Sequence, residues 1–186
     1  MKPWTTLTSR LLLDRTPWLR VWEEDVLLPN GRRINGYLRA EARDYAMVFA
    51  RLTDGTVPLV RQYKHGIAAE SYDLPAGYLE SPAEPPLLAA QRELHEETGL
   101  RAAAWEALGH LVIDTNRGPT RAHIFLALDA YPDGPAHLDE TEALAVSFHS
   151  PAELRALVRG GQINSIASVT GILLALDALA GRQGER

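Results

Sequence analysis

The segment between residues 85 and 99 constrains the fold most, because it predicts a helix with an acidic face beside its apolar face. Pro85-Pro86 is typical of a helix start, where spare backbone donors tolerate proline, and Thr98-Gly99 is typical of a helix end. The apolar side chains recur at helical spacing and are Leu87, Ala90 and Leu94. The acidic side chains share an arc of roughly 100° and are Glu93, Glu96 and Glu97. The chain must therefore pack one face of this helix and accommodate three neighbouring carboxylates.

These carboxylates need compensation, since acidic groups at positions i, i+3 and i+4 repel one another and weaken an isolated helix. A hard divalent cation with oxygen ligands would supply it. A solvated acidic face is the alternative, because charged helix faces are common on protein surfaces. The helix alone leaves both interpretations open.

The composition is that of a globular protein without thiol chemistry. The chain has 186 residues, 46% of them hydrophobic, and a net charge of −5, which predicts one domain plus a short extra piece. An acidic balance disfavours affinity that depends on neutralising nucleic-acid phosphates, so no nucleic-acid partner is expected. The absence of cysteine excludes disulfides, thiolate zinc sites and cysteine nucleophiles, so any metal takes oxygen or imidazole ligands.

The apolar runs predict neither a signal peptide nor a membrane span. Near the start, only Leu11–Leu13 is apolar. The longest stretch, Ile163–Ala180, is interrupted by polar residues, and we expect a packed amphipathic helix over Ile166–Ala180. The helically spaced apolar residues within it are Ile166, Val169, Leu173 and Leu176. We therefore expect a soluble, cytoplasmic protein with no membrane partner.

The N-terminal region reads as β structure. Trp18–Leu28 and Arg33–Ala40 flank Pro29-Asn30-Gly31, which predicts a β-hairpin. Residues 41–44 are mostly charged and mark a domain boundary, which gives an N-terminal β region over 1–42 and a second domain over 43–186. Trp18 and Trp22 lie on the first strand, where they either stack on a nucleobase or pack in a core or interface.

A second pair of strands follows the boundary. Ala46–Leu52 and Val57–Tyr63 flank Asp54-Gly55, which again predicts a hairpin. Beyond the acidic helix we expect three strands, at Ala107–Asp114, His123–Ala130 and Leu144–His149. A helix over Pro151–Arg159 is expected to have Ser150 as its N-cap.

The acidic helix and its approach resemble the Nudix box, G-x5-E-x7-R-E-U-x-E-E-x-G-U, where U is a bulky aliphatic residue. Every specified position from Glu84 to Leu100 matches, whereas six residues instead of five separate Gly77 from Glu84. Val60–Lys64 and Leu74–Gly77 resemble the lead-in of the ADP-ribose pyrophosphatase branch of this family. The resemblance implies an α/β fold, an α/β/α sandwich with a mixed sheet, preceded by a small antiparallel β domain and assembled as a homodimer.

The same resemblance implies roles for individual residues. The implied metal ligands are the Ala76 carbonyl, Glu93, Glu96, Glu97 and Glu142, with Mg²⁺ as the metal and Mn²⁺ as an alternative. The implied catalytic residues are Glu140 as general base and Glu96, which lies close to the metal. Arg61 and Lys64 are candidates for binding phosphate, although both are also compatible with solvated charges on an edge strand. Gly77, Glu84 and Arg92 form the supporting set, in which Arg92 orients the glutamates through charge-assisted hydrogen bonds.

The activity implied is hydrolysis of the diphosphate linkage of ADP-ribose or a related nucleoside diphosphate sugar, which gives a nucleoside monophosphate and a sugar phosphate. Two alternatives remain: a hydrolase of dinucleoside polyphosphates or other nucleotides, and a module that binds a nucleotide sugar without cleaving it. The intact set of Glu93, Glu96 and Glu97 favours an enzyme over a binding module.

Overall fold

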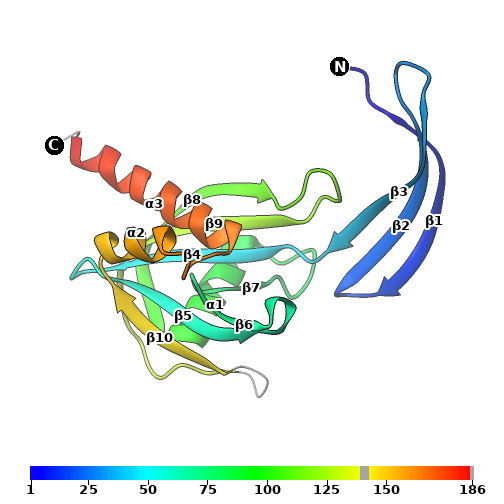
Figure 1. Ribbon diagram of the computed structural model, residues 1–186. Coiled ribbons are helices and arrows are strands. Elements are labelled where there is room, and N and C mark those ends of the chain that lie inside the picture. The colour runs from blue at the N-terminus through cyan, green and yellow to red at the C-terminus, as the bar shows by residue number, and fades with distance from the viewer. Residues whose placement is uncertain (139–142, 185–186) are drawn as a thin grey trace. The chain divides into compact units, whose positions relative to one another are not determined.

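The computed structural model describes residues 1–138 and 143–184 and contains two compact units (Figure 1). The first unit comprises residues 1–44 together with 112–121, and the second comprises the remainder of the described chain. The boundary that we predict after residue 42 divides the chain into two continuous ranges, 1–42 and 43–186. In the structure, the distant segment 112–121 also belongs to the N-terminal unit.

The N-terminal unit contains an antiparallel sheet of three strands in the order β1-β2-β3. This sheet is the small antiparallel β domain that the sequence predicted. Its strands are β1 (Thr5–Arg15), β2 (Leu19–Leu27) and β3 (Arg33–Ala42). The predicted turn joins β2 to β3, with Gly31 at a φ of 81°. Strand β1 was not predicted, because two register shifts interrupt its alternation, one between Thr6 and Thr8 and one between Leu11 and Leu13.

The segment 112–121 lies along β3 within this unit. The Ala40 amide donates to the Arg117 carbonyl at 2.7 Å, and the Ala42 amide donates to the Thr120 hydroxyl at 3.0 Å. Gly118 permits this approach, since a Cβ built there would lie 1.8 Å from the Ala40 oxygen. The backbone of β3 is therefore satisfied on this side by a loop instead of a further strand.

The second unit contains two sheets and three α-helices. The larger sheet has the order β7-β4-β9-β8 and the smaller has the order β10-β5-β6. The strands are β4 (Tyr45–Leu52), β5 (Val57–Lys64), β6 (Ala69–Asp73), β7 (Ala76–Tyr78), β8 (Leu100–Val112), β9 (Arg121–Pro132) and β10 (Leu144–His149). The helices are α1 (Pro86–Thr98), α2 (Pro151–Arg159) and α3 (Ile166–Gly184), with a short 3₁₀ turn, η1, at His65–Ile67.

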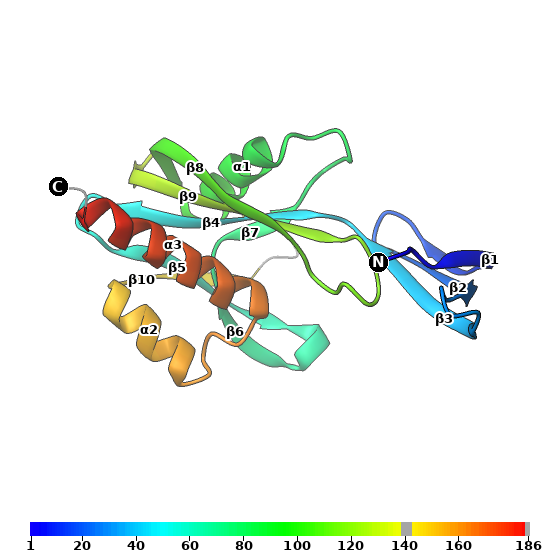
Figure 2. The ribbon, with the colours of Figure 1, turned by 90° about the horizontal axis from the view of Figure 1, so that it is seen from above.

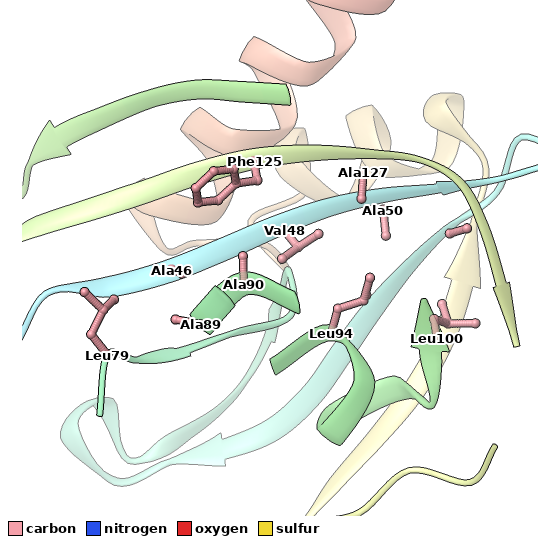
Figure 3. Close-up of a cluster of buried hydrophobic side chains, with 11 residues drawn as sticks. Ala46, Val48, Ala50, Leu79, Ala89, Ala90, Leu94, Leu100, Phe125 and Ala127 are labelled. Atoms are coloured by element: carbon pink, nitrogen blue, oxygen red, sulfur yellow. The ribbon is translucent and has the colours of Figure 1, made fainter. Parts of the chain in front are cut away.

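The larger sheet is mixed and is covered on both faces, which confirms the α/β/α sandwich. Strand β4 pairs in parallel with β9 and antiparallel with β7. Figures 1 and 2 show α1 and α3 on opposite faces of this sheet. Alternate side chains of β4 enter two separate cores: Val48 packs with residues of α1 (Figure 3), whereas Phe49 packs with residues of α2, α3 and the smaller sheet.

The predicted hairpin of the second strand pair is wrong. The turn forms, and the Leu52 amide donates to the Thr56 carbonyl at 2.9 Å. The strands then diverge into different sheets, β4 beside β7 and β9, and β5 between β6 and β10. Turn residues specify only the reversal of the chain. Strand β4, buried on both faces, is paired on each side by other strands instead of β5.

Two boundaries and one buried face also differ from the predictions. Strand β8 begins at Leu100 instead of Ala107, because an alanine-rich stretch gives a weak strand signal. Helix α3 extends to Gly184, and it buries only part of the predicted apolar set: Leu176 is buried, whereas Ile166 is 84% and Leu173 54% exposed. Its packed face instead contains Gly171, where a Cβ would meet the Leu74 side chain at 3.0 Å. Small residues on that face allow close helix–sheet packing.

Candidate active site

Helix α1 places two of its carboxylates inside the protein. The helix begins after Pro85 and ends at Gly99, whose φ of 68° and amide bond to the His95 carbonyl close the last turn. Glu93 is 8% and Glu97 3% exposed, whereas Glu96 is half-buried. A buried carboxylate is costly unless it is paired or binds a cation, so Glu93 and Glu97 do not form a solvated acidic face.

Both buried carboxylates lie against strand β7. The Ala76 amide donates to Oε2 of Glu97 at 3.0 Å. A Cβ built on Gly77 would lie 2.1 Å from Cδ and Oε1 of Glu93, so only glycine leaves room for that carboxylate. The packing thus brings the backbone of Ala76 and Gly77 together with two side chains that follow it by about twenty residues.

Arg92 connects the acidic groups. Its Nη1 donates to Glu93 Oε1 at 2.6 Å and to Glu96 Oε2 at 3.0 Å, and its Nη2 donates to the Tyr78 carbonyl at 3.1 Å. Burial alone would lower the pKa of Arg92, but the hydrogen bonds and charges of Glu93 and Glu96 outweigh it and raise this pKa. Arg92 therefore stays protonated and fixes two of the predicted ligands.

The extra residue between Gly77 and Glu84 is accommodated in the loop before α1. The Glu84 carboxylate accepts a hydrogen bond from the Glu80 amide, and its Oε1 lies 3.5 Å from Nε of Arg92. Glu84 thus still reaches Arg92. Glu80, which sequence reasoning missed, also approaches Arg92 Nε, at 3.8 Å. No spacing rule identifies Glu80, because it lies in the loop that departs from the box.

The donor chemistry around α1 fits a hard divalent cation. Within residues 1–138 and 143–184, no three acidic or histidine side chains are grouped tightly enough to hold a metal ion by themselves. The arrangement nevertheless offers only oxygen donors, and the four carboxylates within ion-pair distance of Arg92 exceed its single positive charge. A bound divalent cation would offset that excess, with backbone carbonyl oxygen as a further donor.

A cavity of about 690 Å³ opens beside Ala76 and Gly77, within the second unit. Its polar lining includes Gln62, Lys64, Asp73 and Asn164. Tyr45 and Tyr78 meet edge to face at its wall, with ring centroids 6.4 Å apart. Burial, followed by the effects of Tyr78 and Asp73, raises the pKa of Tyr45 to about 12.

The two candidates for binding phosphate, Arg61 and Lys64, lie on opposite faces of strand β5. Lys64 lines the cavity, whereas Arg61 does not. Arg61 instead lies 3.7 Å from the Glu70 carboxylate and 6.0 Å from the centroid of the Tyr72 ring, on the neighbouring strand. Positions 61 and 64 differ by an odd number on β5 and so face opposite sides.

Glu140 and Glu142 lie outside the described residues, so their predicted roles stay predictions. In the N-terminal unit, the Trp22 ring is approached by the guanidinium groups of Arg39 at 4.0 Å and Arg20 at 5.0 Å. Within this unit the Trp22 ring therefore packs against two arginine side chains.

Two family models match the chain. The NUDIX domain model matches residues 42–168, and the model of the nucleoside diphosphate sugar hydrolase N-terminal domain matches residues 4–37. The first match covers more than half of the chain, which therefore belongs to the Nudix hydrolase family. Nudix hydrolases generally use divalent metals, in agreement with the oxygen-rich site on α1.

Individual relatives refine this placement. The chain is 36% identical over 123 residues to the ADP-ribose pyrophosphatase of Mycobacterium tuberculosis (strain ATCC 25618 / H37Rv), a match that covers 64% of this chain but only 58% of that protein. It is 29% identical over 181 residues to the ADP compounds hydrolase NudE of Escherichia coli (strain K12), covering 95% of this chain and 94% of the relative. These relatives confirm the resemblance to the ADP-ribose pyrophosphatase branch.

A solved structure agrees with the fold of the whole chain. The crystal structure of an ADP compounds hydrolase matches with a TM-score of 0.85 at 26% identity, covering 98% of this chain and 97% of that chain. The fold predicted from the sequence is thereby confirmed. Separately, none of the helices in the described part of the chain is long and apolar enough to cross a membrane.

Proposed function

We propose that this protein hydrolyses the diphosphate linkage of ADP-ribose or a related nucleoside diphosphate sugar, with Mg²⁺ bound, and releases a nucleoside monophosphate and a sugar phosphate. The observation that carries the proposal is the pair of buried carboxylates, Glu93 and Glu97, held against Ala76 and Gly77 at the edge of a large cavity. The relatives called ADP-ribose pyrophosphatase and ADP compounds hydrolase support this substrate class.

In this proposal Glu93, Glu97 and the Ala76 carbonyl hold Mg²⁺, and Glu96 binds a further ion or its water. When bound there, the metal would neutralise phosphate oxygens and lower the pKa of a coordinated water. Arg92 keeps Glu93 and Glu96 in place, since its fork of donors reaches both carboxylates. Mn²⁺ also accepts oxygen ligands and is the natural alternative.

The chain's own groups then bind and orient the substrate. Lys64 would hold phosphate in the cavity, and Arg61 would do so only after leaving Glu70. Hydrolysis forms a bond between the water oxygen and phosphorus and breaks the bond from phosphorus to the bridging oxygen. The water proton passes to a carboxylate, which we assign to Glu140, and the bridging oxygen leaves with the other phosphate. Glu142 is the proposed additional metal ligand.

A homodimer is part of the proposal. The N-terminal unit exposes several large apolar side chains, and exposed apolar groups of this kind mark interaction surfaces when they gather in one patch. They are Trp4, Leu7, Leu11, Leu12, Trp18, Leu19 and Leu38. A second copy of the chain would cover them, and light scattering at micromolar concentration should give twice the mass of the chain. A monomer under these conditions would contradict the assembly.

A product-resolved hydrolysis panel tests the activity. The substrates are ADP-ribose, UDP- and GDP-sugars and diadenosine polyphosphates, each with Mg²⁺, with Mn²⁺ and with a chelator. We expect turnover only with metal, and a nucleoside monophosphate with a sugar phosphate as products. The Glu97→Gln variant is the control, because it keeps the shape of the side chain and removes a charged ligand. Absence of turnover across the panel would refute the proposed hydrolase activity and favour a binding module.

A further inference from the structure

The segment that leads into helix α3 holds the strand before the candidate site. The Tyr72 amide donates to the Gln162 carbonyl at 3.4 Å, and the Ser71 hydroxyl donates to the Asn164 side-chain oxygen at 3.3 Å. These contacts join residues that are about ninety positions apart in the sequence. They place the first turn of α3 beside residues 71–74.

Ser168 forms the buried end of this connection. Its hydroxyl donates to Oδ1 of Asp73 at 2.8 Å and accepts a hydrogen bond from the Leu74 amide at 3.2 Å. Ser168 is 0% and Asp73 8% exposed. The Ser168 amide in turn donates to the Ser165 hydroxyl at 3.1 Å, which fixes the start of the helix. One hydroxyl thus serves a carboxylate and a backbone amide with little access of water to either.

The residues that follow Leu74 reach the candidate metal site directly. The Pro75 carbonyl accepts a hydrogen bond from the Val48 amide at 2.9 Å, and the Ala76 amide donates to Glu97 at 3.0 Å. The segment 74–77 is therefore fixed by β4, by α1 and, at its first residue, by α3 through Ser168.

We infer that Ser168 is a positioning residue for this site. By holding Asp73 and the Leu74 amide, it sets the path of residues 74–77, and with it the direction of the Ala76 carbonyl and the place of Gly77 against Glu93. Ser168 does not line the cavity, so in this inference it acts through the backbone of residues 73–77. This inference rests on the proposed function, because the quantity that it sets is the geometry of the proposed metal ligands.

Ser168→Ala tests this role, and two further variants make the result specific. Ser168→Thr restores the hydroxyl at the same position. Thr170→Ala removes a hydroxyl from the same turn of α3, but that hydroxyl donates to the Ile166 carbonyl of its own helix at 2.7 Å and does not reach Leu74. The comparison therefore separates loss of a hydroxyl on α3 from loss of the connection to residues 73–74.

Three measurements are made on the full chain: the melting temperature without metal, the binding of Mn²⁺ alone by electron paramagnetic resonance, and kcat and KM for ADP-ribose at varied Mg²⁺. For Ser168→Ala we expect Mn²⁺ affinity to fall by about 10- to 100-fold, as is typical when support for a ligand is lost. We expect kcat to fall further than KM rises. Ser168→Thr should recover much of the affinity, and Thr170→Ala should match the unmodified protein at temperatures where all are folded.

Wild-type Mn²⁺ affinity in Ser168→Ala, equal losses in Ser168→Thr, or the same losses in Thr170→Ala would each overturn the inference. Failure of the unmodified protein to hydrolyse any compound of the panel would instead refute the proposed function. The Mn²⁺ comparison would still decide the role of Ser168 in that case, since it needs no turnover.

Discussion

Replacing Gly77 with alanine should separate the stability of the fold from the integrity of the site. The new Cβ would lie 2.1 Å from Cδ and Oε1 of Glu93 and 2.4 Å from Oε2. Because carbon and oxygen atoms rest at roughly 3.5 Å, the Glu93 carboxylate must retreat by more than about 1 Å. It would thereby leave the position in which it accepts a 2.6 Å hydrogen bond from Arg92.

The cost to folding should be modest and the cost to function large. The obstructing atoms belong to the end of a flexible side chain, so an altered rotamer relieves the clash at about 0.5–1.5 kcal/mol. A displacement of about 1 Å of a group that positions the reacting partners lowers the rate by roughly 10²-fold. We therefore expect Gly77→Ala to fold, with kcat reduced about a hundredfold and a higher Mg²⁺ requirement.

Gly181→Ala is the matched control, because nothing lies within 4 Å of a Cβ built at that position of α3. Gly181→Ala should leave activity unchanged and raise the free energy of unfolding by about 0.4–1 kcal/mol. Thermal melting and Mg²⁺-dependent kinetics on both variants test the reasoning. Gly77→Ala with normal kcat and normal Mg²⁺ dependence would refute the claim that glycine is required there for Glu93.

The other predictions concern charged side chains around the site. Glu140→Gln should lower kcat by about 10²–10⁴-fold with little change in metal dependence, whereas Glu142→Gln should raise the Mg²⁺ concentration for half-maximal rate; equal losses with identical metal curves would contradict the two assignments. Lys64→Ala should raise KM for ADP-ribose more than Arg61→Ala, because of these two residues only Lys64 lines the cavity. Steady-state kinetics test this, and an equal or reversed order would contradict phosphate binding in the cavity. Arg92→Lys keeps the charge but loses the fork, so it should weaken Mn²⁺ binding by about 10- to 100-fold in a direct titration, and an unchanged affinity would exclude the proposed role.

Local chemistry made much of the fold predictable. Helix α1 follows the predicted segment because its start and stop signals lie in adjacent residues, Pro85-Pro86 and Gly99. Helix α2 has the predicted bounds, and the Ser150 hydroxyl accepts from the Glu153 amide in a complete capping box. Sheet membership was less accessible, since pairing of β4 with β9 joins residues more than seventy positions apart. The turn residues Asp54-Gly55 are the same whether the two flanking strands pair with each other or enter different sheets.

The candidate site also has one part that local sequence predicts and one part that depends on tertiary packing. Glu93, Glu96 and Glu97 lie on one helix, so helical spacing alone places them together. The opposing surface comes from elsewhere: Ala76 contributes its backbone, and Gly77 contributes only the absence of a side chain.

The cavity shows why the remainder was not predictable. It assembles residues from β4 to β7 and from the segment before α3, and its lining contains ordinary residues such as Gln62, Asn164 and Met47. None of these residue types indicates a site by itself, and only the topology brings them together. Ser168 presents the same difficulty, because a serine near a helix start is usually interpreted as a local cap. Here its hydroxyl reaches Asp73 and Leu74, ninety-four or more residues earlier, so its contribution depends on tertiary packing that no local pattern encodes.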